Sequence, residues 1–181
     1  MADNSTRTVQ SGTHENGKLD ISALVLTAIL AAAGLILNLT LGAAFQTLNI
    51  HPQFLIAAYC LAIVIVRPKT PQAIVLGLIA AAVAQLGTSI PGMNFVTEAA
   101  GSLVMGLFVN SKFGQSKAMP YVAALVATLV SGLLFAALGN VVAGMPMANL
   151  IVKLPVVVVT AVFNAIVVGA LASPLKKAAR R

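Results

Sequence analysis

Six long apolar runs, separated by short polar segments, dominate the chain. They cover residues 21–45, 54–66, 73–86, 95–109, 121–138 and 150–171. The apolar sequence is almost continuous, and a helix needs about 20 residues to cross a bilayer. The pattern therefore predicts an all-α integral membrane protein, a six-transmembrane-helix bundle with short loops. The second, third and fourth runs are short, so we expect them to tilt, extend into their flanks or re-enter.

Polar segments mark the ends of the membrane domain. The first 20 residues lack the apolar core of a signal peptide, so we expect residues 1–20 to form a disordered cytoplasmic tail. Residues 21–175 form the predicted six-helix membrane domain. Residues 176–181 form a second, basic cytoplasmic tail.

Charge supports this interpretation and supplies an orientation. Only 8% of the residues are charged, against roughly 25% in a soluble domain. The net charge of +7 comes from basic residues that stand singly or in pairs between the runs, rather than in a patch for nucleic acid. With the N-terminus inside, every Lys and Arg except Lys153 falls on the cytoplasmic side, as the positive-inside rule requires. Both termini are therefore predicted to be cytoplasmic.

The sequence lacks the motifs of the common catalytic classes. It contains no GxxxxGK[ST] nucleotide loop, no HExxH motif and no pair of carboxylates within the runs. The single cysteine, Cys60, excludes an internal disulfide and a cysteine-only metal cluster. We therefore expect no enzymatic activity, no metal and no cofactor.

Two charged residues within the predicted membrane domain point to a site near the outer loops. Glu98, the only acidic residue after Asp20, lies one turn into the fourth run, and Lys153 begins the sixth. An ionisable group at membrane depth is costly and usually faces a partner or a cavity. Glu98 and Lys153 either form a salt bridge between helices or bind the cationic and anionic groups of a small molecule. The polar residues expected to join them are Asn94, Gln85, Asn149 and His51.

Other polar residues in the runs have simpler interpretations. Thr160 and Asn164 share a helical face with Lys153. For Asn38 and Asn164 we expect hydrogen bonds between helices. Ala28 and Ala32 form a small-residue pair on the first run, suited either to packing within the bundle or to docking of another subunit.

Several stretches carry a resemblance to a known family. They are HPQFLIAAYCLAIVIVRPKT, GLIAAAVAQLGTSIPGMNFVTEAAG, LPVVVVTAVFNAIV and the alanine-rich stretch 28–34. With the six-run layout, they resemble the substrate-binding S components of energy-coupling factor transporters. The nearest branch is the tryptophan-transport (TrpP-like) branch.

The resemblance implies a substrate-capture subunit of an ATP-driven importer in the bacterial plasma membrane. It would bind a tryptophan-like amino acid or a water-soluble vitamin at the outer face. Its partners would be a scaffold transmembrane subunit, docked through Ala28 and Ala32, and two cytoplasmic ATPase subunits that use the ATP. The chain has no Trp, so stacking on an indole would fall to Phe54 or Phe95, together with Met93, Met145 and Met147. The alternatives are a self-sufficient secondary transporter or small channel, and a membrane-embedded assembly or sensor protein without a small ligand.

Overall fold

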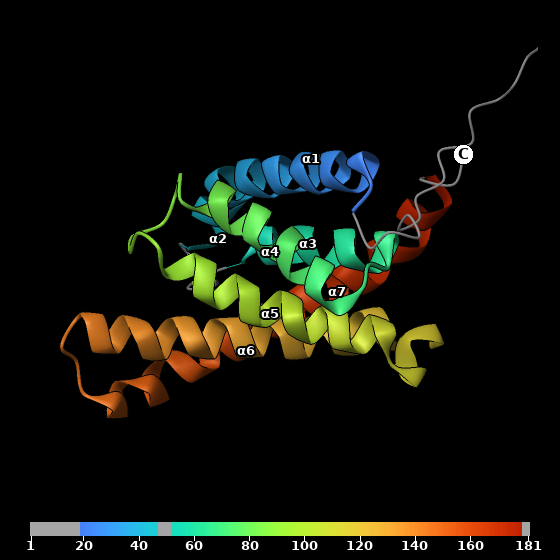
Figure 1. Ribbon diagram of the computed structural model, residues 1–181. Coiled ribbons are helices and arrows are strands. Elements are labelled where there is room, and N and C mark those ends of the chain that lie inside the picture. Colours follow the sequence, from blue (N-terminus) through green and yellow to red (C-terminus); the bar gives the residue numbers. More distant parts are fainter. Residues whose placement is uncertain (1–18, 47–51, 179–181) are drawn as a thin grey trace, which may run out of the picture.

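The computed structural model describes residues 19–46 and 52–178, and this part of the chain is helical without a strand (Figure 1). The α-helices are α1 (Ile21–Leu37), α2 (Ala43–Gln46), α3 (Phe54–Val66), α4 (Thr70–Ala84), α5 (Met93–Asn110), α6 (Met119–Val142) and α7 (Leu150–Ala178). A π-helical turn, η1 (Asn38–Gly42), joins α1 to α2, and 3-10 turns η2 (Lys112–Gln115) and η3 (Met147–Asn149) precede α6 and α7. Since α1, η1 and α2 are continuous, six helical segments result, one for each apolar run. The prediction of an all-α, six-helix chain is confirmed.

The boundaries differ from the predicted ones mainly at the last helix. α7 continues past Pro174 to Ala178, so Lys176 and Lys177, expected in a tail, lie in its last turn. The tail predicted over residues 1–20 lies outside the described residues except for Leu19 and Asp20. Three helical segments are long and apolar enough to cross a membrane, namely Ile21–Gly42, Met119–Val142 and Met147–Ala178. α3 and α4 are apolar but shorter.

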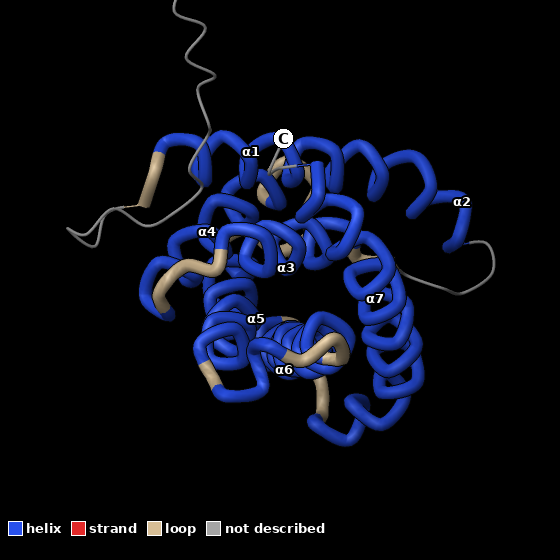
Figure 2. Tube along the Cα trace, turned by 90° about the vertical axis from the view of Figure 1, so that its right-hand side faces the viewer, coloured by secondary structure: helices blue, strands red, loops and turns tan. Residues whose placement is uncertain are grey.

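The short helix α3 forms the centre of the bundle. All of its residues except Ile65 are buried, and it packs against α1, α4, α5 and α7 (Figure 2). A helix that is apolar on every face is typical of a buried position or of a membrane span. The uniformly apolar sequence of residues 54–66 agrees with the central position of α3.

α1 lies at the edge of the bundle and packs through small side chains. Ala23, Thr27, Ala31 and Gly34 face inward and are buried. A Cβ atom on Gly34 would lie 2.9 Å from the carbonyl oxygen of Phe54, so α1 and α3 approach closely because this position is glycine. The opposite face of α1 exposes large apolar side chains, including Ile29 and Ile36.

The antiparallel helices give the molecule two chemically different ends. One end, here called the basic end, holds the start of α1, the α3–α4 and α5–α6 connections and the end of α7 (Figure 1). The opposite end, here called the loop end, holds α2, the segment 85–92 and the segment 143–149. The described basic residues at the basic end are Arg67, Lys69, Lys112, Lys117, Lys176 and Lys177. Lys153 is the single described basic residue near the loop end.

Arg67 joins two connections at the basic end. Its backbone adopts the left-handed conformation that ends α3, and its guanidinium Nη2 donates to the carbonyl oxygens of Val109 (3.3 Å) and Gly114 (2.9 Å). Asn110 donates in turn to the carbonyl oxygen of Pro68 at 3.0 Å. The Arg67 bonds satisfy carbonyl groups at the ends of α5 and η2, and the Asn110 bond satisfies a carbonyl group in the connection between α3 and α4.

Gly77 marks the closest approach of α4 to α5. A Cβ atom there would overlap Ser102 Oγ and lie 2.8 Å from the backbone oxygen of Glu98. Gly77→Ala is therefore expected to destabilise the folded protein by about 1–3 kcal/mol, measured by thermal unfolding in detergent. Gly139→Ala is the matched control, because its Cβ would meet only Ile90 at an ordinary 3.7 Å. Equal losses in the two variants would contradict this packing.

Candidate functional site

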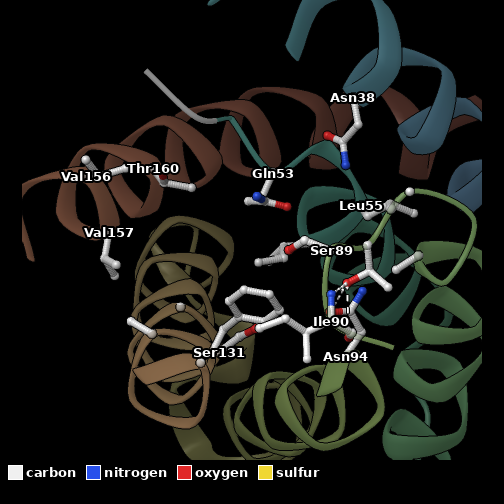
Figure 3. A pocket seen from close by; sticks show the side chains of 18 of the residues that line it. Asn38, Gln53, Leu55, Ser89, Ile90, Asn94, Ser131, Val156, Val157 and Thr160 are labelled. Atoms are coloured by element: carbon white, nitrogen blue, oxygen red, sulfur yellow. Dashed lines mark hydrogen bonds between the residues drawn. The ribbon is translucent and has the colours of Figure 1, made fainter. Parts of the chain in front are cut away.

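A cavity of about 850 Å³ opens at the loop end of the bundle (Figure 3). Its walls come from the end of α1, η1, the start of α3, the segment after α4, the start of α5, the second half of α6 and the first half of α7. This volume lies within the range of pockets that hold small molecules. The polar residues that line it are Asn38, Gln53, Thr88, Ser89, Asn94, Glu98, Thr128, Ser131, Lys153 and Thr160.

Glu98 supplies the negative charge of this cavity. Its side chain projects from the second turn of α5 and is buried. Ser131 Oγ on α6 donates to Glu98 Oε2 at 3.2 Å, and Thr97 Oγ1 lies 3.5 Å from Glu98 Oε1. No basic side chain of the described residues forms an ion pair with it. A buried carboxylate with hydroxyl donors but no cation is suited to receive a positively charged group.

Lys153 supplies the positive charge, from the first turn of α7. Its ammonium group donates a hydrogen bond to Oδ1 of Asn140, a fully buried residue at the end of α6. Asn140 Nδ2 in turn lies 3.5 Å from the carbonyl oxygen of Pro146. The salt bridge between Glu98 and Lys153 that the sequence left open is not formed, and the ammonium group donates to Asn140. Both charges line the same cavity without neutralising each other.

The other predicted site residues fall into two groups. Asn94 is buried, lines the cavity and lies 3.5 Å from Thr88 Oγ1. Gln85 does not line it. Its side-chain oxygen accepts from the backbone N–H of Gly92 at 2.9 Å, which closes the segment between α4 and α5. Asn149 is exposed and is not part of the cavity wall, and His51 lies outside the described residues.

The interhelical hydrogen bonds predicted for two asparagines are confirmed. Asn38 Oδ1 accepts from the backbone N–H of Phe54 at 2.8 Å, so it satisfies a free donor at the start of α3. Asn164 Nδ2 donates to the carbonyl oxygen of Gln53 and to Thr128 Oγ1, each at 3.3 Å. Asn38 also lines the cavity, a second role that its isolated position in an apolar run did not indicate.

The aromatic part of the wall differs from the one expected. Phe135 on α6 lines the cavity, together with Met145. Phe54 instead packs edge-on against Phe163, with ring centroids 5.5 Å apart, and Phe95 is not part of the wall. Sequence reasoning also missed Ser131 and Gln53. Small polar residues in alanine-rich runs carry no signal that separates them from packing residues.

The cavity combines an apolar surface with polar groups of defined charge. Leu35, Leu39, Ile56, Phe135, Val156 and Val157 form its apolar part. Figure 3 shows side chains from four sides, among them Asn38, Gln53, Ser131 and Thr160, around a common space. Such a site can bind a small molecule with an apolar body, a cationic group and an anionic group. Over the described residues, no group of His, Cys, Asp and Glu side chains is placed to hold a metal ion.

Comparisons with known proteins give no indication of function, so the functional interpretation rests on the chemistry of the cavity. No protein family model, no curated protein and no solved structure matches the chain.

Proposed function

We propose that this protein is the substrate-binding S component of an energy-coupling factor importer. It crosses the bacterial plasma membrane six times and holds both termini in the cytoplasm. One observation carries the proposal, namely a ligand-sized cavity with two charges that do not pair with each other, at the end opposite the basic residues. By the positive-inside rule the basic end is cytoplasmic. The cavity then faces outward, where a substrate for import is captured.

The cavity chemistry suits a tryptophan-like amino acid or a water-soluble vitamin. Glu98 binds the cationic group of the ligand, and Lys153 exchanges its bond with Asn140 for a bond to the anionic group. Phe135 and the aliphatic wall cover the apolar body. These assignments explain why two ionisable side chains are retained within a predicted membrane domain, where they are costly.

The proposed importer needs further subunits. The chain contains no Walker-type nucleotide loop, so the energy would come from two cytoplasmic ATPase subunits through a scaffold transmembrane subunit. Ala28 and Ala32 are exposed on α1, to one side of the face formed by Ala23, Thr27, Ala31 and Gly34 that packs inward. The exposed pair is accessible to the scaffold subunit within the membrane.

Ligand binding to the isolated protein tests the proposal. The chain is purified in detergent and titrated by calorimetry with L-tryptophan and with a panel of water-soluble vitamins. We expect one of these to bind with a stoichiometry of one. A folded protein that binds none of them would argue against a receptor. Uptake into liposomes by the protein alone would indicate a secondary transporter instead.

Lys153→Ala is expected to weaken binding of that ligand by roughly fivefold, since a partly exposed ion pair contributes up to about 1 kcal/mol. Calorimetry gives the dissociation constants. Lys112→Ala is the control, because Lys112 is exposed at the basic end, away from the cavity. If Lys153→Ala binds as tightly as the unmodified protein, Lys153 does not contact the ligand.

A further inference from the structure

Tyr59 on the central helix α3 carries a buried polar group without a partner. The side chain is fully buried, and its hydroxyl oxygen makes no hydrogen bond within the described part of the chain. A buried hydroxyl is rarely left unpaired, because its loss of hydration is not compensated. A phenylalanine would fill the same space without that cost. Packing alone therefore does not explain why this position is tyrosine and not phenylalanine.

The Tyr59 hydroxyl lies against α5, close to Glu98 and Ser131. A Cβ atom on Gly101 would collide with the Tyr59 oxygen and would lie 3.3 Å from Ser131 Cβ. Because Gly101 has no side chain, the surface of α5 leaves space there for the Tyr59 hydroxyl. Glu98 lies three residues before Gly101, on the same face of α5, and it accepts from Ser131 Oγ at 3.2 Å. The Tyr59 hydroxyl, Ser131 and the Glu98 carboxylate therefore meet at the wall of the cavity.

The Glu98 carboxylate can accept further hydrogen bonds on the side that faces Tyr59. Two carboxylate oxygens offer about four acceptor positions. The hydroxyl groups of Ser131 and Thr97 occupy at most two of them, since the Thr97 hydroxyl also lies 3.4 Å from the carbonyl oxygen of Asn94. The Tyr59 hydroxyl can donate, and the carboxylate beside it can accept. Since no described cation pairs with Glu98, each added donor helps to fix the direction of its charge.

We infer that Tyr59 is a positioning residue for Glu98, whose hydroxyl donates a third hydrogen bond that holds the carboxylate toward the cavity. Tyr59 does not line the cavity and would act on a ligand only through Glu98. This role rests on the proposed function insofar as the ligand carries a cationic group. The inferred contact needs no ligand, so it can be tested on the isolated protein.

Infrared spectroscopy of the ligand-free protein in detergent tests the contact. The chain has only four acidic residues, so the C=O stretch of protonated Glu98 is identified as the band that Glu98→Gln removes at low pH. Loss of a donor to this group raises the frequency of the stretch. We expect Tyr59→Phe to shift the band upward. Tyr121→Phe, which alters the only other tyrosine, is expected to leave the band in place.

A second variant keeps the inference testable if Tyr59→Phe does not fold. In a Tyr121→Phe background, uniform 3-fluorotyrosine labelling modifies Tyr59 alone and makes its hydroxyl a stronger donor. The Glu98 band should then move downward, opposite to the shift in Tyr59→Phe. An unmoved band in either experiment overturns the inference. Thermal unfolding offers a further contrast, since a purely structural unpaired hydroxyl predicts that Tyr59→Phe is more stable than the unmodified protein.

Ligand affinity separates this inference from the proposed function. If L-tryptophan or a vitamin binds, Tyr59→Phe should weaken binding several-fold, and by less than Glu98→Gln does. If none of them binds but the infrared band shifts, the receptor proposal fails while the contact between Tyr59 and Glu98 stands. If binding is strong and the band does not move, the receptor stands and Tyr59 has no positioning role.

Discussion

Glu98→Gln is expected to weaken ligand binding about 10- to 100-fold, because a hydrogen bond to a charged group contributes about 1.5–3 kcal/mol. The amide keeps the size of the side chain but removes the charge that a cationic group would meet. The effect should be the largest of any single substitution in the cavity, since Glu98 is the only carboxylate among the described residues that line it. Calorimetry on the purified variant gives the change in dissociation constant.

The same chemical change elsewhere provides the control. Asp20→Asn also turns an acid into its amide, but at the start of α1, at the basic end, so affinity should not change. An analogue without the amine adds a second control. If L-tryptophan is the ligand, indole-3-propionate should bind Glu98→Gln and the unmodified protein alike. If Glu98→Gln binds the amine-bearing ligand with unchanged affinity, Glu98 does not contact the ligand.

The helices and the end that carries the cavity could be predicted from the sequence. Each apolar run becomes one helical segment, because its length and composition suit a helix better than a loop. Glu98 and Lys153 stand out because ionisable residues are rare in such runs, and both line the cavity. The polar breaks also separate the basic end from the loop end correctly, since they alternate along an antiparallel bundle.

The rotation of each helix could not be predicted, and most of the cavity wall depends on it. An amphipathic helix reveals its inner face by periodicity, but both faces of these helices are apolar. Ser131 and Thr128 on α6 therefore resembled packing residues. The partner of Lys153 could not be predicted either, because Asn140 lies after the apolar run 121–138, whereas α6 continues to Val142.

Substitution of Ala28 and Ala32 together by leucine is expected to abolish most ATP-dependent uptake while ligand binding stays unchanged. Both side chains are exposed on α1 and lie one turn apart. Bulky residues would keep a scaffold subunit from close approach, and overpacking of about 1–3 kcal/mol reduces partner affinity roughly 5- to 150-fold. Uptake is measured in liposomes that contain the proposed scaffold and ATPase subunits. Binding is measured on the isolated variant.

The neighbouring alanine gives a matched control on the same helix. Ala33 is exposed as well, but it lies about 100° around the helix from Ala32, so Ala33→Leu should face lipid and leave uptake intact. Since α1 packs inward through Ala23, Thr27, Ala31 and Gly34, neither variant disturbs the core. Full uptake by the double variant would show that the partner docks elsewhere. Equal loss of binding and uptake would instead assign Ala28 and Ala32 to the stability of the bundle.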